Sequence, residues 1–190
     1  MDIPCSMRIL LIITELHEGG AENAFGHVAA GAAEAGHVVQ AVALHGGDGT
    51  VGDRLREAGI PVTDIGCRRF GDLPRLRRLR RIAAEFAPHV AHSWLFHANL
   101  AARLVVPACV PLICSLRVCE PRRTHVFLDR WTRRRVSLYL ANSQDVAMFA
   151  EHRLKVSSDR IKTIPNGVDA GFFGQACRDR SSDQELKGLT

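Results

Sequence analysis

The sequence lacks any apolar run long enough to cross a bilayer as a helix. Such a span needs about 18 consecutive apolar residues, whereas the apolar stretch Ile9 to Ile13 has the length of a buried strand. Residues 1–6 also lack the charged-then-apolar order of a signal peptide. These absences favour a cytoplasmic protein over a membrane-spanning or secreted one.

The six cysteines form no CxxC pair and no spacing typical of a zinc site. The histidines are scattered along the chain, so the sequence gives no reason to expect a bound metal. In a protein without a secretion signal, we expect thiols that are reduced and mostly buried.

The motifs of three common enzyme classes are missing as well. Residues 17–22 read His-Glu-Gly-Gly-Ala-Glu, which is neither the GxGxxG of dinucleotide-binding proteins nor the Walker sequence of P-loop proteins. The GxSxG elbow of serine hydrolases is also absent. Any chemistry must therefore come from another constellation of residues.

What the sequence does have is the composition of one globular domain. It contains 190 residues, of which 46% are hydrophobic and 24% charged, and this length can bury a single sizeable core. The net charge is +5, and arginines concentrate in Arg68 to Arg81 and in Arg117 to Arg135. Such clusters either face a phosphate-rich partner or form solvated helix faces. No pattern of a nucleic-acid-binding module appears, so we expect no nucleic acid partner.

Short apolar runs alternate with amphipathic stretches along the chain. We predict seven strands, at residues 8–14, 38–44, 61–65, 89–94, 111–116, 137–141 and 161–164. Six helices are predicted between them, at residues 21–35, 51–58, 73–86, 97–106, 126–135 and 143–153. This order predicts a mostly parallel, doubly wound, Rossmann-like α/β sheet with helical crossovers on both faces.

Ligands bind at the carboxyl ends of the strands in an open parallel sheet. The polar and unusual residues follow four of the predicted strands: Glu15 to Gly20 after the first, Trp94, Phe96, His97 and Asn99 after the fourth, Arg117 to Glu120 after the fifth, and Asn142 and Ser143 after the sixth. The topology therefore predicts that these residues share one edge of the sheet.

Gly19, Gly20 and His97 stand out at this edge. The glycines precede a predicted helix, so its free N–H groups and its positive dipole end face the cleft, and a phosphate or sugar oxygen can approach the backbone. Equally, a glycine pair can simply make a tight turn. His97 begins a helix and either hydrogen-bonds a substrate oxygen or is a partly buried helix-start residue. His92 lies inside a strand, and we interpret it as structural.

Several segments together resemble a known family. The run MRILLIITELHEGGAENAF resembles the opening of the retaining GT-B glycosyltransferases of the large family four. FAPHVAHSWLFHANLAARL is similar to the family's fourth strand and following helix, commonly PDVVHxHxxxAN. PLICSLR, LYLANSQ and IKTIPNGVDAGFF match in order and spacing. The resemblance covers Met7 to Phe173. It implies the N-terminal half of a GT-B fold at residues 7–168, followed at 169–190 by an interdomain linker and the truncated start of a donor-binding domain.

The resemblance implies transfer of a sugar from a nucleotide-sugar, used as co-substrate, to a hydroxyl of an acceptor glycan or lipid. The family's N-terminal domain largely binds the acceptor. By position, His97 is the catalytic candidate, and the candidates for binding substrates are Gly19, Gly20, Asn99, Arg117, Asn142 and Ser143. No metal or other cofactor is expected, because a helix dipole and basic side chains stabilise the leaving diphosphate.

Two departures from the family pattern matter. The second histidine of the HxH motif is Trp94 here. The family's C-terminal domain, with its EX7E carboxylates, has no counterpart in residues 174–190. We therefore expect a hexosyltransferase-like protein that is inactive without a donor-binding half, such as a separate chain would supply. The alternative is a non-catalytic acceptor-binding module or a truncated relic.

Two physical expectations follow. The helix that carries Arg75 to Arg81 is predicted to attach weakly to anionic lipid, which places the protein peripherally at the inner membrane face. A domain shaped to meet a second domain exposes apolar surface, so we expect poor stability in isolation. The functional interpretation as a whole requires Gly20 and His97 at the same end of the sheet.

Overall fold

The computed structural model describes residues 6–67 and 71–167, which form a single parallel sheet with helices on both faces. The strands are β1 (Arg8–Ile13), β2 (Val38–Ala43), β3 (Val62–Asp64), β4 (Val90–Trp94), β5 (Leu112–Leu116), β6 (Leu138–Ala141) and β7 (Ile161–Thr163). Their order across the sheet is β3-β2-β1-β4-β5-β6-β7. All neighbouring pairs are parallel, which confirms the predicted doubly wound topology.

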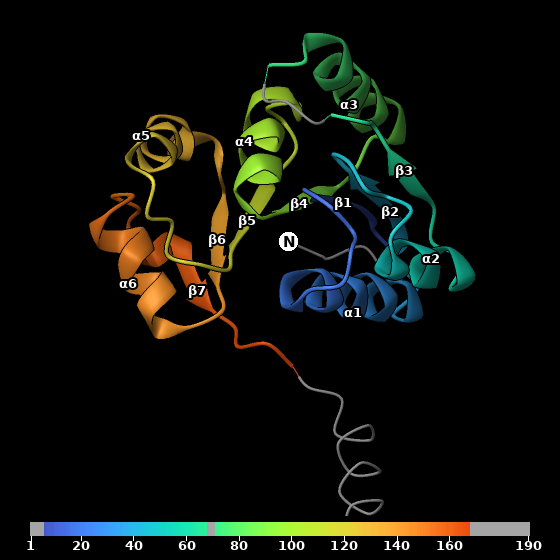
Figure 1. Ribbon diagram of the computed structural model, residues 1–190, viewed down its shortest axis with the longest axis horizontal. Coiled ribbons are helices and arrows are strands. Elements are labelled where there is room, and N and C mark those ends of the chain that lie inside the picture. The colour runs from blue at the N-terminus through green and yellow to red at the C-terminus, as the bar shows by residue number, and fades with distance from the viewer. Residues whose placement is uncertain (1–5, 68–70, 168–190) are drawn as a thin grey trace, which may run out of the picture.

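The helices are α1 (Gly20–Glu34), α2 (Thr50–Glu57), α3 (Leu73–Phe86), α4 (Phe96–Val105), α5 (Arg123–Thr132) and α6 (Gln144–His152), with short 3-10 turns η1 (Arg133–Arg135) and η2 (Ser158–Arg160). Figure 1 shows α1 and α2 on one side of the sheet, and α3 and α4 on the other. The direction of strand winding reverses between β1 and β4, so the helices that follow these two strands leave for opposite faces.

The core is divided into two layers by the sheet. Leu11 and Ile13 of β1 pack with Phe25 of α1 in one layer. Leu10 and Ile12 point the other way and join the apolar residues of α3, α4, α5 and α6 in the larger layer. A strand with both faces buried therefore needs the near-continuous apolar run that β1 has.

All predicted strands and helices are present, with small differences at their ends. The largest concerns α5, which was predicted to begin at Val126 but begins at Arg123. The residues before Val126 are polar, with Arg123 and Thr124 exposed, so the apolar periodicity begins only at the buried Val126. The cap predicted for α6 is Ser143, whose Oγ accepts a hydrogen bond from the Val146 N–H at 3.3 Å.

Some sequence expectations meet a mixed outcome. Cys67 and Cys114 are buried, but Cys109 and Cys119 are exposed, so the thiols are not mostly buried among the four that the structure describes. Cys5 and Cys177 lie outside the described residues, as does the predicted linker at 169–190. Within the described ranges, no helix combines the length and apolar character that a bilayer span requires.

Candidate functional site

The switch point between β1 and β4 brings the two main sequence candidates to the same end of the sheet. The strands are parallel neighbours in register, with Ile13 opposite Trp94 at their carboxyl ends. Gly20 begins the helix that follows β1, and His97 is the second residue of the helix that follows β4. Because these helices diverge to opposite faces, a crevice opens between them, as the topology of such sheets requires.

The glycine pair leaves the start of α1 open. Gly19 is the N-cap residue and has an extended backbone, with no side chain to satisfy the helix N–H groups. A Cβ added at Gly20 would meet nothing within 4 Å, whereas one at Gly19 would overlap the Glu22 carboxylate. Glu22 therefore folds back over the helix start, where the dipole favours an anion.

The loop after β2 supports the glycine loop from behind. The Leu16 N–H donates to the Gly46 carbonyl at 3.3 Å, and a Cβ at Gly49 would overlap the Leu16 carbonyl. His45 Nδ1 lies 3.9 Å from a carboxylate oxygen of Glu15. Glycine at position 49 is thus required by the close approach of two backbones.

Arg117 lies over the ring of Trp94 at the centre of the crevice. The guanidinium carbon is 4.3 Å from the ring centroid, a cation–π contact. Trp94 is buried and meets Phe25 of α1 edge to face, with centroids 5.7 Å apart. Burial lowers the pKa of Arg117, and the nearby Glu22 partly opposes this shift, but an arginine stays charged at any physiological pH. The stack therefore holds a fixed positive charge at the ends of β4 and β5.

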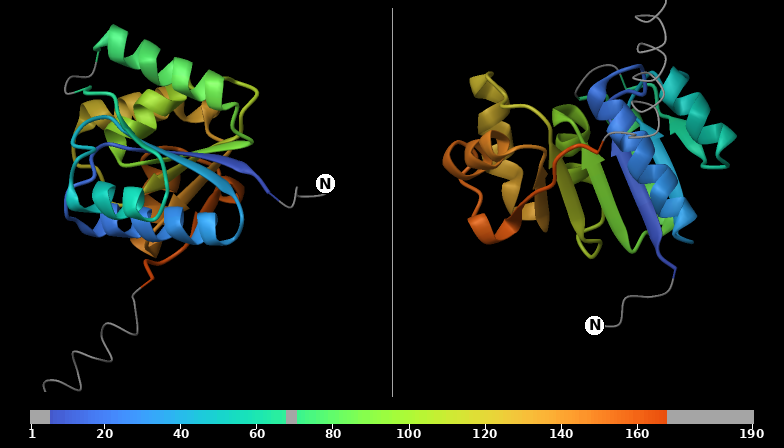
Figure 2. Two further views of the ribbon diagram at one scale, coloured as in Figure 1. Left: turned by 90° about the vertical axis from the view of Figure 1, so that its right-hand side faces the viewer. Right: turned by 90° about the horizontal axis from the view of Figure 1, so that it is seen from below.

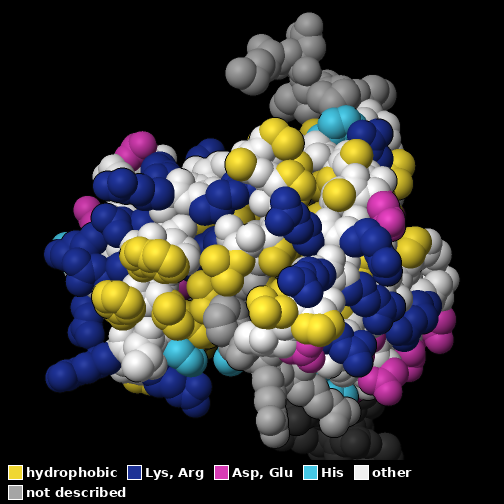
Figure 3. All heavy atoms as spheres, turned by 90° about the horizontal axis from the view of Figure 1, so that it is seen from above, with side chains coloured by type: hydrophobic (Ala, Val, Ile, Leu, Met, Phe, Trp, Pro, Cys, Tyr) yellow, Lys and Arg dark blue, Asp and Glu magenta, His cyan; other side chains and the backbone are white. Residues whose placement is uncertain are grey.

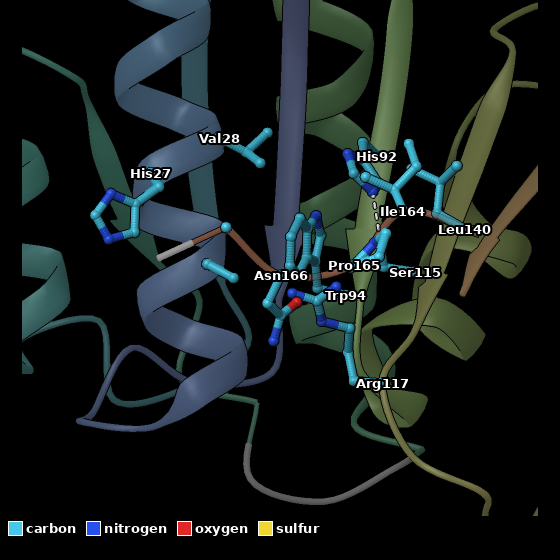
Figure 4. Close-up of a pocket in the computed structure, with 12 residues that line it drawn as sticks. His27, Val28, His92, Trp94, Ser115, Arg117, Leu140, Ile164, Pro165 and Asn166 are labelled. Carbon is cyan, nitrogen blue, oxygen red and sulfur yellow. Dashed lines mark hydrogen bonds between the residues drawn. The ribbon is translucent and has the colours of Figure 1, made fainter. Parts of the chain in front are cut away.

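A cavity of about 670 Å³ opens beside this stack, on the face of the sheet that α1 covers only in part. Its wall residues come from α1, β4, β5, β6 and the chain after β7: Ala24, His27, Val28, His92, Trp94, Ser115, Arg117, Leu140, Ile164, Pro165, Asn166 and Gly167. Figure 2 shows from below how the chain after β7 runs over the middle strands toward α1. Figure 4 shows Arg117 beside Trp94, and His92 farther from Arg117, on the earlier part of β4.

His92 is an uncharged polar group in the cavity wall. Its Nε2 lies 2.8 Å from Ser115 Oγ, and both side chains are buried. Burial, with a smaller contribution from the Arg117 charge, lowers the pKa of His92 from 6.5 to about 3. The ring is therefore neutral at pH 7 and offers a hydrogen bond rather than a charge.

His97 belongs to a small aromatic and acidic cluster on the other side of the crevice. Phe96 stacks on His125 of α5 with ring centroids 3.8 Å apart and planes 7° apart. His97 meets the same His125 ring edge to face at 5.6 Å. Glu120 Oε2 lies 3.0 Å from His125 Nδ1.

The pKa values of this cluster favour a neutral His97. Partial burial lowers the pKa of His97, and His125 and Arg122 lower it further, while Glu120 opposes them. Burial, the largest single effect, acts to raise the pKa of Glu120, but the nearby His125 and Arg122 together outweigh it and the pKa is lowered. An ionised Glu120 therefore orients His125, which in turn lies against His97.

The remaining predicted residues occupy different depths. Asn99 is 1% exposed, accepts a hydrogen bond from Ser93 Oγ at 2.7 Å and donates to the Ser115 carbonyl at 2.9 Å. It therefore joins β4 to β5 beneath the crevice. Asn142 donates from Nδ2 to the Arg117 carbonyl at 3.1 Å and fixes the chain that carries Arg117. Its Oδ1 is buried and has no hydrogen-bond partner among the described residues. Ser143 Oγ is engaged as the α6 cap.

Sequence reasoning placed Glu120 at the ligand edge and interpreted His92 as structural, but it missed the pairing of Glu120 with His125 and the place of His92 in the cavity wall. A signal existed for Glu120 and His125, because both follow β5 at the predicted ligand edge. The signal for His92 was its two-residue spacing from Trp94, since side chains two apart in a strand share a face. In residues 6–67 and 71–167, no three His, Cys, Asp or Glu side chains are grouped so that they could hold a metal ion. The expected independence of metal stays a prediction.

Comparison with known proteins places this geometry in context. The model of the family described as Glycosyltransferase Family 4 matches residues 18–172. The fold is similar to Anabaena HepE in complex with UDP and glucose, with a TM-score of 0.71 and 22% identity, covering 86% of this chain and 45% of that one. A Rickettsia africae glycosyltransferase gives a TM-score of 0.69 at 14% identity, covering 93% and 50%.

The lipopolysaccharide outer core galactosyltransferase WaaB gives a TM-score of 0.63 at 12% identity, covering 86% of this chain and 46% of that one. The chain therefore spans about half the length of the solved structures that it matches. None of the curated proteins matches its sequence.

Proposed function

The chain belongs to glycosyltransferase family 4, and from this premise we propose that its crevice is the acceptor-side half of a sugar-transfer site. In the proposed reaction, a hydroxyl of an acceptor glycan or lipid takes the sugar from a nucleotide-sugar, and a nucleoside diphosphate leaves. The observation that carries this proposal is the fixed charge of Arg117 on Trp94, beside the open start of α1 at the switch point.

Two sources of positive potential face the place where negative charge develops. The N–H groups at Gly19 and Gly20 and the guanidinium of Arg117 flank the crevice. A preorganised positive charge stabilises a leaving diphosphate more than it stabilises the ground state. The proposal therefore needs no metal. In this proposal Glu22 moves away from the helix start when the anion binds, because its carboxylate occupies the space beside Gly19.

His97 is proposed to contact the transferred sugar or the attacking hydroxyl. Its ring lies exposed at the start of α4 and is neutral at pH 7 because its pKa is lowered. A neutral imidazole can accept a proton at one nitrogen and donate a hydrogen bond from the other. The pair of Glu120 and His125 holds the edge of this ring in place.

The cavity beside Trp94 is proposed to receive the acceptor. It is lined mainly by apolar side chains with a few polar groups, such as the neutral pair of His92 and Ser115. This is the usual composition of a site for an organic ligand, in which few polar groups fix the orientation. The UDP and glucose bound to HepE support a nucleotide-sugar as the other substrate.

The donor is proposed to be held by a second domain, because the chain spans about half of its structural neighbours. That domain would come from further chain or from a separate protein. The same observation supports a second candidate, an acceptor-binding module without catalysis. The two differ in outcome, since only the first gives transfer when a donor-binding domain is supplied.

The experiment incubates the full chain with UDP-glucose, UDP-galactose or GDP-mannose and an oligosaccharide acceptor, with and without a family-four donor-binding domain. Release of nucleoside diphosphate that requires both proteins supports the enzyme. No release with any donor, while NMR still detects acceptor binding at Trp94, supports the module. Absence of both acceptor binding and UDP binding contradicts the whole proposal.

Arg117→Gln is the decisive variant. We measure the affinity for UDP of the chain together with the donor-binding domain. We expect it to fall about tenfold in the variant, because one charge-assisted contact with phosphate is lost. Arg153→Gln, an exposed arginine at the end of α6, is the matched control and should leave the affinity unchanged. Equal affinities of the two variants would remove Arg117 from the site.

A further inference from the structure

Helix α5 exposes two large aromatic side chains on one stripe. Phe127 is 66% exposed and Trp131 is 72% exposed, and they lie four residues apart, one above the other on the helix surface. Neither belongs to the core, which α5 joins through the buried Val126. Adjacent exposed aromatic residues on a folded domain indicate a contact surface.

The same stripe is strongly basic. Arg123 and Arg130 of α5 are exposed near the aromatic pair, and Arg134 is exposed in the η1 turn that directly follows α5. Within the described part of the chain, these three arginines form no ion pair with an acidic residue. Figure 3, which looks onto the α3–α5 side, shows apolar side chains surrounded by Lys and Arg side chains, with few Asp or Glu side chains.

We propose that the outward stripe of α5 and η1, formed by Arg123, Phe127, Arg130, Trp131 and Arg134, docks on the surface of an anionic phospholipid bilayer. Aromatic rings settle at the boundary between headgroups and acyl chains, while arginines bind the phosphates beside them. A second copy of the chain is a poorer occupant, because two identical basic stripes would repel each other. The inference does not depend on the proposed sugar transfer.

Helices α5 and α3 differ in what they can contribute to lipid binding. Helix α3 carries the basic segment singled out in the sequence, but its one large exposed apolar residue, Leu73, is at its first position. Arg81 of α3 also lies 3.8 Å from Glu85. Helix α3 therefore contributes only long-range attraction to anionic lipid, whereas α5 combines attraction with insertion of side chains.

Docking through α5 would hold the crevice next to the bilayer. Glu120 is three residues before the first residue of α5, and His125 in its first turn contacts Phe96. His125 is partly buried in the cluster, while Phe127 is exposed. The helix thus separates a crevice side from a lipid side.

The test is sedimentation of the full chain with vesicles of phosphatidylcholine alone or with phosphatidylglycerol. We expect binding only to the anionic vesicles, weakened by salt. The double variant Phe127→Ser with Trp131→Ser should bind at least about tenfold more weakly, since the inserted apolar area is lost. Met148→Ser, an exposed apolar residue of α6, is the matched control and should bind like the parent.

Two further measurements protect the test against misfolded variants. Replacing Arg123, Arg130 and Arg134 with Gln should lower the affinity roughly fivefold for each arginine at low salt. Trp131 emission should shift to the blue on binding, and Trp131→Phe should remove this shift while binding persists, because the other tryptophan, Trp94, is already buried.

Three results would overturn the proposal. One is equal binding to neutral and anionic vesicles, and another is full binding by the double aromatic variant. The third is a shift from dimer to monomer in sedimentation velocity when the aromatic residues are replaced, which would assign the stripe to a second copy of the chain.

Discussion

His92 and His97 are both kept neutral near the crevice, by different surroundings. His92 lies inside β4 and is desolvated, so its pKa falls to about 3. His97 lies at the start of α4 with part of its surface exposed, and its pKa is lowered by partial desolvation of the ring together with the neighbouring His125 and Arg122. The buried His92 should therefore influence the pH dependence of stability, whereas the pKa of His97 bears on its proposed role in the reaction, and variants of the two should separate these effects.

His92→Gln should remove part of the pH dependence of folding. The unfolded chain binds a proton at this ring below pH 6.5, while the native chain does so only below about 3. Between these values the unfolded state binds more protons, so the free energy of unfolding falls as the pH falls. From pH 7 to pH 5 the loss is about 2 kcal/mol. Glutamine cannot take up the proton, so urea unfolding of the variant should show a smaller loss.

His27→Gln provides the comparison for that experiment. His27 is exposed on α1 at the opposite wall of the same cavity. Because this residue is exposed, its replacement is the control for the loss of a histidine from the cavity wall. If both variants showed the same slope between pH 5 and 7, burial would not be what controls His92.

His125→Gln should raise the pKa of His97. Burial remains in the variant, but the lowering effect of the His125 charge disappears. The native pKa of His97 would then approach its ordinary value, and any activity that needs the neutral ring would lose its acidic limb at a higher pH. Titration of the His97 ring by NMR measures this directly, without an activity assay. An unchanged or lower pKa would contradict the proposed coupling.

At the scale of elements, the glycine loop and the loop behind it should respond in opposite ways to alanine. Gly49→Ala should destabilise the fold by about 2 kcal/mol, because the new Cβ overlaps the Leu16 carbonyl. Gly20→Ala adds its Cβ in open space at the first turn of α1 and should leave the stability equal or slightly higher. Thermal unfolding of both variants tests this contrast.

For ligand binding, unlike for stability, Gly20→Ala is expected to be harmful. If the α1 start receives the donor diphosphate, Gly20→Ala should weaken UDP binding in the assembled pair while the fold stays intact. A Gly20→Ala variant that binds UDP like the parent would leave the glycine pair with the simpler role of a tight turn.

Elements were predictable because their signals are local. The alternation of apolar runs and amphipathic stretches fixed seven strands and six helices, and parallel winding then brought Gly20 and His97 to one edge. The start of α5 was misplaced because an exposed first turn leaves no apolar signal. The stack of Arg117 on Trp94 was not predictable, because it depends on the register of β5 against β4 and on the path after each strand.

For the whole molecule, the burial of each side chain was harder to predict than its position at the carboxyl edge of the sheet. Asn99 and His97 are two residues apart, yet one is buried beneath the crevice and the other is exposed. The cavity was missed for a similar reason, since its walls come from α1, three strands and the chain after β7. Such a cavity exists only after α1 has packed on one part of the sheet and left the other part uncovered.

The same cavity leads to a prediction about the stability of the isolated chain. Val28 and Ile164 line it and remain largely exposed, so apolar area that a second domain would cover faces water. We expect the chain alone to bind the dye ANS and to unfold at a modest temperature. A donor-binding domain should raise the melting temperature in a concentration-dependent way, because it binds only the folded state.

Replacing Val28 and Ile164 with Ser isolates the contribution of this surface. Both side chains are on the cavity wall rather than in the core, so the double variant should lose ANS binding without a lower melting temperature. It should also respond less to the added domain, since the apolar contact is weakened. A sharp, reversible transition of a monodisperse parent monomer that ignores the added domain would show instead that this face needs no cover.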